Sequence, residues 1–193
     1  MSTTSDLGQL ERRAWQSYHQ DGLMEIAFGA ILVSTFFGSV ADQYRYIAYA
    51  LLLLIGPCLA LGKRWITAPR MGAVEFGPSR KSRKVRVVLF IAALVACTAL
   101  LPALLGGAQW LRDHPTVVSI GLGSMVFLSF AAIAYWLELR RIYAVGVLFG
   151  LAFMTTEWLD NPIPLLTAGM LVLLFGLWRL SQFVKANPIP PQA

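Results

Sequence analysis

Two glutamates near the ends of apolar segments are the residues best placed to do chemistry in this chain. Glu25 lies close to the start of one long apolar run, and Glu157 lies close to the end of another. An ionisable side chain is costly inside a bilayer, so a glutamate at that depth is a candidate for moving an ion or a proton. Solvation by the headgroup region is the alternative interpretation, because both residues lie near a segment end. Glu25 and Glu157 are therefore the candidate transport residues.

Other reactive residue types are few and poorly placed for chemistry. The only two histidines, His19 and His114, lie outside the apolar runs, so a haem held by two histidines within a helical bundle has no ligands. Cys58 and Cys97 lie inside apolar runs, where a cysteine usually packs as a small hydrophobic residue. No nucleophile motif, metal-ligand spacing or phosphate-binding glycine loop is present. The sequence predicts a protein that is not an enzyme, with no cofactor and no metal.

The amino-acid composition indicates that most of the chain lies within a membrane. The chain has 193 residues, of which 57% are hydrophobic and only 13% are charged. A soluble domain carries about 25% charged residues, and a protein of this size has too little interior to hide such an apolar excess from water. About 20 apolar residues span a bilayer as a helix, so the chain has room for six spans. We therefore expect a polytopic membrane protein.

Six apolar runs are candidate membrane spans. The predicted fold is all-α, with about six transmembrane helices, an amphipathic helix before the first and a short cytosolic β-hairpin between the second and third. The organisation is an amphipathic segment (1–22), a first helical pair (23–62), a basic loop (63–86), two further pairs (87–137 and 138–183) and a tail (184–193). The six runs are residues 23–40, 46–62, 87–107, 119–137, 143–158 and 163–183.

The basic residues are sorted strongly between the two sides of these predicted spans. One side receives only Arg45 and Arg112, and the other receives the remaining fourteen of the 16 lysines and arginines. Because lysine and arginine are enriched on the cytosolic side of membrane proteins, both termini should be cytosolic. The fourteen residues are Arg12, Arg13, Lys63, Arg64, Arg70, Arg80, Lys81, Arg83, Lys84, Arg86, Arg140, Arg141, Arg179 and Lys185.

The segment before the first span has the pattern of an amphipathic helix. In residues 6–20, the apolar face includes Trp15 and Tyr18, whereas His19 and two arginines face away. Such a helix could lie on the cytosolic membrane surface or dock on a loop of the same protein. Asp21 and Gly22 should then form a turn into the first span, where the positive end of the helix favours a carboxylate.

The loop at residues 63–86 combines two predicted strands with a high positive charge. The strands are residues 64–68 and 73–76, and the Pro69–Gly72 segment between them has the composition of a turn. Its basic residues would attract anionic lipid headgroups or a protein partner, although they could be topology signals alone. No nucleic-acid-binding motif accompanies the charge, so nucleic acid is not an expected partner. The candidate lipid- or partner-binding residues are Arg64, Arg70, Arg80, Lys81, Arg83, Lys84 and Arg86.

A G-x-x-x-G motif, Gly146 to Gly150, lies in the fifth predicted span. Glycines four residues apart on a helix allow a second helix to approach closely. We expect the motif to pack within the bundle, with a homodimer seam as the alternative.

Three segments of the sequence resemble segments of known proteins. They are the Leu10–Glu11–Arg12 segment with its Asp21–Gly22–Leu23 continuation, the run from Ile66 to Phe76, and the ending from Phe183 to Pro188. In these the chain resembles small bacterial inner-membrane proteins of unknown function. The resemblance implies a bacterial inner-membrane location and assigns no catalytic residue.

Two functions fit these patterns. The first is a non-enzymatic membrane scaffold, or an accessory or regulatory subunit, whose basic cytosolic face binds membrane lipids or a protein partner. The alternative is a small oligomeric transporter or channel that uses Glu25 and Glu157. A homo-oligomer is compatible with either function.

Overall fold

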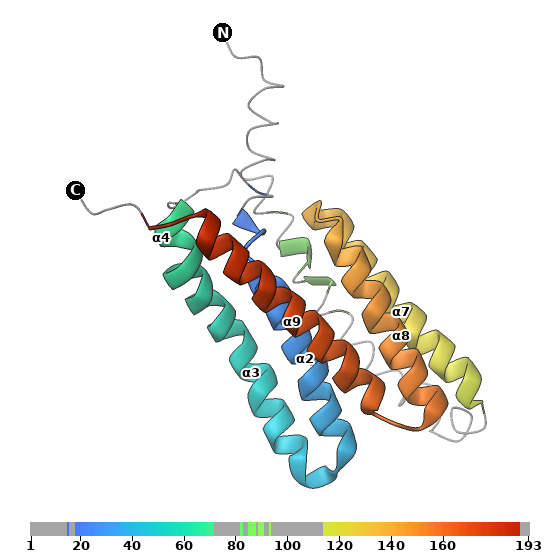
Figure 1. Cartoon of the computed structure of the whole chain (residues 1–193). Helices are drawn as coiled ribbons and strands as arrows, with labels where there is room; N and C mark the ends of the chain where they lie inside the picture. The colour runs from blue at the N-terminus through green and yellow to red at the C-terminus, as the bar shows by residue number, and fades with distance from the viewer. Residues whose placement is uncertain are drawn as a thin grey trace. The chain divides into compact units, whose positions relative to one another are not determined.

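A computed structural model describes Trp15, residues 18–71, the positions 82, 85–87, 89–90 and 93, and residues 114–189. The regular elements there are all helical (Figure 1). The chain divides into a first unit, Met1–Glu75 with Leu165–Ala193, and a second unit, Phe76–Pro164. The elements are α2 (Leu23–Val40), η1 (Asp42–Tyr44), α3 (Arg45–Gly62), η2 (Lys63–Thr67), α4 (Ala68–Met71), α7 (Pro115–Leu137), α8 (Arg141–Leu159) and α9 (Ile163–Ala186).

Five helices in the described residues are long and apolar enough to cross a membrane, as expected for a membrane protein. They lie at Leu23–Val40, Arg45–Met71, Thr116–Leu137, Arg141–Leu159 and Ile163–Ala186, close to five of the six predicted spans. The other predicted span, residues 87–107, lies almost wholly outside the described residues.

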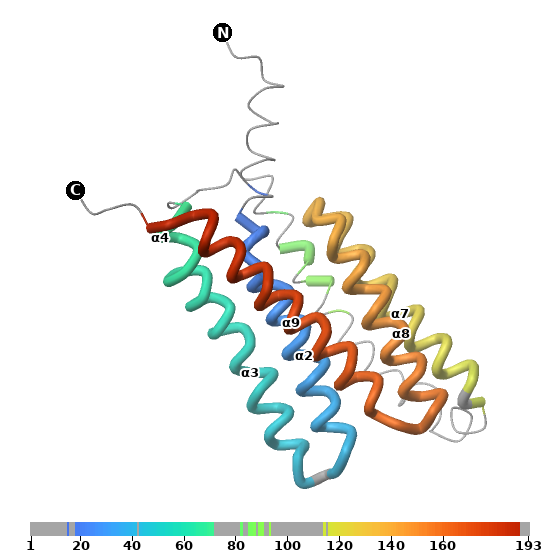
Figure 2. Tube along the Cα trace, viewed as in Figure 1, coloured from blue at the N-terminus to red at the C-terminus, as the bar shows by residue number. Residues whose placement is uncertain are grey.

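The first unit begins with a helical hairpin. Helix α2 runs into α3 through the short 3₁₀ turn η1, as the trace in Figure 2 shows. Gly22 precedes α2 with φ of 81°, a left-handed conformation that favours glycine. The side chain of Asp21 caps the helix start, because its Oδ1 accepts a hydrogen bond from the Leu23 N–H at 3.2 Å. The predicted Asp21–Gly22 turn is confirmed.

The predicted β-hairpin is wrong. Helix α3 continues through η2 and α4 to Met71, so the first predicted strand, residues 64–68, is helical, and no strand occurs in the described part of the chain. The second predicted strand, residues 73–76, lies outside the described residues. Pro69 explains part of the error, because a proline followed by Gly72 is typical of a turn, whereas here it follows a π turn near the end of a continuous helix.

The turn before Pro69 is a π-helix. The Ala68 N–H donates a hydrogen bond to the carbonyl of Lys63, five residues earlier. The π turn therefore keeps the helix continuous up to the proline. Single π turns inside α-helices often accompany functional sites.

Helix α2 and the turn before it pack against α9 through two pairs of glycines, each pair seven residues apart: Gly22 and Gly29, and Gly169 and Gly176. A Cβ on Gly29 would lie 2.6 Å from the Leu173 backbone nitrogen, and one on Gly176 would lie 2.7 Å from that of Ile26. Since Gly29 faces Gly169 while Gly176 faces the start of α2, the two helices run antiparallel. Their backbones are in direct contact, which is how small residues allow membrane helices to associate.

The second unit is built around the pair α7 and α8. A Cβ added to Gly150 would lie 2.8 Å from the carbonyl oxygen of Gly123 in α7. A Cβ added to Gly146 would lie 2.5 Å from the Cβ of Phe130, also in α7. The rings of Phe130 and Phe149 pack against each other at a tilt, with centroids 4.4 Å apart. The Gly146–Gly150 motif therefore packs within the bundle, against α7, as expected.

Candidate functional site

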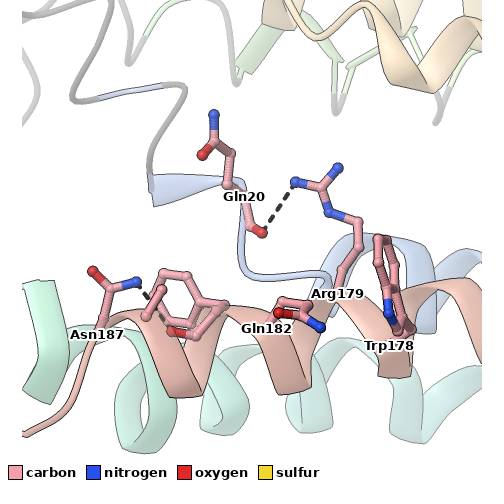
Figure 3. Close-up of a pocket in the computed structure, with 7 residues that line it drawn as sticks. Gln20, Trp178, Arg179, Gln182 and Asn187 are labelled. Atoms are coloured by element: carbon pink, nitrogen blue, oxygen red, sulfur yellow. Dashed lines mark hydrogen bonds between the residues drawn. The ribbon is translucent and has the colours of Figure 1, made fainter.

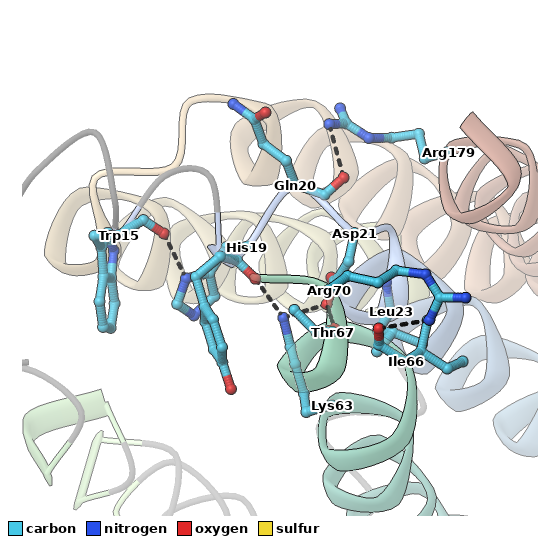
Figure 4. A network of polar contacts seen from close by, with 11 residues as sticks. Trp15, His19, Gln20, Asp21, Leu23, Lys63, Ile66, Thr67, Arg70 and Arg179 are labelled. Carbon is cyan, nitrogen blue, oxygen red and sulfur yellow. Dashed lines mark hydrogen bonds and ion pairs between the residues drawn. The ribbon is translucent and has the colours of Figure 1, made fainter. Parts of the chain in front are cut away.

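A buried ion pair ties the start of α2 to the end of the long α3 helix. The Lys63 Nζ lies 2.6 Å from Oδ2 of Asp21, and the Thr67 hydroxyl donates a hydrogen bond to the same oxygen at 2.5 Å (Figure 4). Asp21 is completely buried, and Lys63 is 14% exposed. Because the other Asp21 oxygen accepts from the Leu23 N–H, both carboxylate oxygens are satisfied. Burial of a charge requires this kind of pairing and hydrogen bonding.

Lys63 also holds the segment before α2. Its ammonium group donates to the Tyr18 carbonyl at 2.7 Å and lies 4.4 Å from the centroid of the Tyr18 ring. A cation over an aromatic face is a favourable contact, more so when it is shielded from water. We call the residues Tyr18, Asp21, Lys63 and Thr67 the Asp21 network.

The described residues before Asp21 dock on the protein. Trp15 is fully buried, and the Nδ1 of His19 is hydrogen-bonded to the Trp15 carbonyl at 2.9 Å. The predicted outward position of His19 is wrong, because the residue is only 6% exposed and its ring packs at a tilt against Trp15, with ring centroids 4.3 Å apart. Of the two interpretations of the amphipathic segment, docking on the protein fits these residues. The rest of the segment lies outside the described residues.

The titration of Tyr18 provides a test of the Asp21 network. Burial raises the pKa of the Tyr18 hydroxyl, and the negative charge of Asp21 adds to the increase. A raised pKa in the folded state means that stability is complete below the unfolded value of about 10 and is lost as pH rises through the folded pKa. We expect wild-type protein to lose stability in this alkaline range more steeply than Tyr18→Phe. Denaturation midpoints measured from neutral to alkaline pH check this, and parallel profiles would contradict it.

The predicted basic residues are only partly described. Arg64 and Arg86 are exposed, and Arg70 is half-buried and donates to the Ile66 carbonyl of its own helix at 2.8 Å. Arg64 belongs to the first unit and Arg86 to the second. The predicted Arg80, Lys81, Arg83 and Lys84 lie outside the described residues.

The two candidate transport glutamates have different environments. Glu25, in the first turn of α2, is 2% exposed, whereas Glu157, near the end of α8, is exposed. They belong to different units. Burial sets Glu25 apart as the stronger candidate, and exposure of Glu157 fits solvation at a helix end.

Sequence reasoning missed Lys63 and Thr67 as partners of Asp21. A helix through residues 63–71 brings both side chains to one carboxylate, a placement that the hairpin prediction concealed. Within the described residues, no three histidine, cysteine, aspartate or glutamate side chains are grouped so that they could hold a metal ion. No protein-family model, curated protein or solved structure matches the chain.

Proposed function

We propose that the chain is a non-enzymatic protein of the bacterial inner membrane, a scaffold or accessory subunit, whose basic cytosolic face binds anionic lipid. The observation that carries the proposal is the separation of charge, with fourteen of the 16 basic residues on one side of the predicted spans. The resemblance of three sequence landmarks to small bacterial inner-membrane proteins supports the location. A protein partner on the same face is the alternative occupant.

The length of the second candidate span supports a surface position for its basic end. Arg45–Met71 has 27 residues, and at 1.5 Å per residue it is about 40 Å long. The hydrocarbon core of a bilayer is about 30 Å thick. The excess of about 10 Å, or about two turns, is enough for the end of this helix near Met71 to reach the headgroups, and Arg64 nearby is exposed. Because Asp21 neutralises Lys63, we expect Arg64 and the basic residues that follow it to be the ones that contact lipid.

Neutralising the basic run should remove the preference for anionic lipid. Each lysine or arginine near an anionic surface contributes about 1 kcal/mol. Replacing Arg80, Lys81, Arg83 and Lys84 with glutamine should therefore markedly reduce the enrichment of phosphatidylglycerol around the protein, with Arg64, Arg70 and Arg86 left to account for the remainder. Lipid-class analysis of polymer nanodiscs extracted from bacterial membranes measures the enrichment.

The matched control neutralises the two basic residues on the opposite side. The variant Arg45→Gln/Arg112→Gln should retain the enrichment seen for the wild type. Equal loss in both variants would contradict a one-sided lipid surface. Unchanged lipid with loss of a co-extracted protein in the first variant alone would favour the partner instead.

Burial of Glu25 favours a second candidate function, a small oligomeric transporter or channel. A carboxylate that is 2% exposed within a candidate span is the kind of residue that marks an ion or proton path. Proton or cation flux into proteoliposomes, compared between wild type and Glu25→Gln, tests this function. Flux that Glu25→Gln abolishes and Glu157→Gln leaves intact would support it, and absence of flux in the wild type would reject it.

A further inference from the structure

A pocket of about 390 Å³ lies along the last turns of α9, beside Gln20 (Figure 3). Its lining residues include one arginine, three amide residues and two aromatic residues, with no acidic residue among them. The nearest acidic residue in sequence, Asp21, is already paired with Lys63. The charge of the pocket is therefore positive, from Arg179, with no acidic lining residue to offset it. The residues concerned are Gln20, Trp178, Arg179, Gln182, Phe183 and Asn187.

Arg179 is held over this pocket with most of its donors available. One Nη2–H donates to the Gln20 carbonyl at 3.3 Å, and the Cζ atom lies 5.9 Å from the centroid of the Phe175 ring. A guanidinium has five N–H donors in a planar fork that matches the oxygens of a phosphate group. The exposed side-chain amide of Gln182 adds a further donor, whereas Gln20 contributes the backbone carbonyl that accepts from Arg179. The polar part of the pocket suits a phosphate oxyanion.

An exposed apolar stripe on α9 leads directly to the pocket. Leu171, Leu174, Phe175 and Trp178 are 60%, 55%, 44% and 58% exposed. Their spacing of three, four and seven residues places them on one helix face. The stripe extends about 10 Å along the helix from Leu171 to Trp178, which itself lines the pocket. A ligand with a phosphate and a long apolar chain would contact both parts.

We propose that this pocket binds the phosphodiester of one membrane phospholipid, with an acyl chain along the α9 stripe. The inference rests on the proposed function only in taking α9 to cross a bilayer with this end at its surface. The pocket would recognise a different part of the lipid from the basic face, because Arg179 would contact the phosphodiester that zwitterionic and anionic phospholipids share. Binding therefore does not require an anionic headgroup.

Native mass spectrometry of the delipidated full chain, titrated with phosphatidylcholine, tests the pocket. We expect wild type to retain one lipid, and Arg179→Gln to weaken its retention at least tenfold. Gln182→Glu, which places a carboxylate at an exposed rim position, should weaken it similarly without affecting folding. Lys185→Gln is the matched control, an exposed basic residue of α9 outside the pocket lining, and should bind like wild type.

Several results would overturn the inference. They are failure to retain phosphatidylcholine, equal retention by wild type and both pocket variants, and equal loss in Lys185→Gln. Inorganic phosphate and soluble glycerophosphocholine should bind far more weakly than the diacyl lipid, and equally tight binding would indicate a soluble phosphate ligand instead. Arg179-dependent retention of phosphatidylcholine without enrichment of phosphatidylglycerol would uphold the pocket and reject the anionic-lipid function.

Discussion

Asp21→Ala should destabilise the protein by about 3–5 kcal/mol, the usual cost of leaving one partner of a buried ion pair without the other. The variant removes the acceptor of Lys63 and Thr67 together with the cap of α2. It should also release the segment around Tyr18, which Lys63 holds through a hydrogen bond and a ring contact. Chemical denaturation in detergent measures the loss of stability.

A double-mutant cycle separates the ion pair from the cap. Asp21→Ala/Lys63→Met removes both charges, so it should be less destabilising than the two single changes added together. Glu157→Ala, at an exposed carboxylate, should stay within about 0.5 kcal/mol of wild type. Equal stability of Asp21→Ala and Glu157→Ala, or strict additivity in the cycle, would contradict the network.

Gly29→Ala and Gly176→Ala should each destabilise the protein by about 1–3 kcal/mol, the typical cost of overpacking. The added methyl groups would lie 2.6 Å and 2.7 Å from backbone nitrogens of the facing helix. Backbone atoms cannot move aside as a flexible side chain does, so α2 and α9 must separate. Thermal unfolding in nanodiscs measures the effect.

Gly56→Ala is the matched control for these two variants. Gly56 lies in α3, and a Cβ built there meets no atom within 4 Å. Since alanine favours a helix over glycine by about 0.5–1 kcal/mol, this variant should be neutral or slightly stabilising. Destabilisation by Gly56→Ala as large as that by Gly29→Ala would show that close helix packing is not the cause.

Hydrophobic runs predicted the long helices well because burial in a bilayer leaves a continuous signal. The run at residues 23–40 coincides with α2, and the run at 163–183 falls within α9. The strand prediction within residues 63–71 failed because short stretches with Trp, Ile and Thr carry only a weak strand preference. Contacts to Asp21, 46 residues from Thr67 in sequence, hold that stretch instead, and no local pattern contains them.

The candidate sites were predictable only in part for the same reason. Asp21 was recognisable from its place before an apolar helix, because capping is local. The position of Lys63 beside it depends on tertiary packing. The sequence indicates Arg179 only as a charge that sets topology, because its contact with Gln20 in the pocket joins residues 159 positions apart.

Selectivity for anionic lipid in a defined bilayer tests the central claim most directly. Electron paramagnetic resonance of spin-labelled lipids measures how strongly phosphatidylglycerol and phosphatidylcholine associate with the reconstituted wild-type protein. The basic face predicts a higher association constant for phosphatidylglycerol, which should decline as salt screens the surface charges. Equal association constants for the two lipids at low salt would contradict the account.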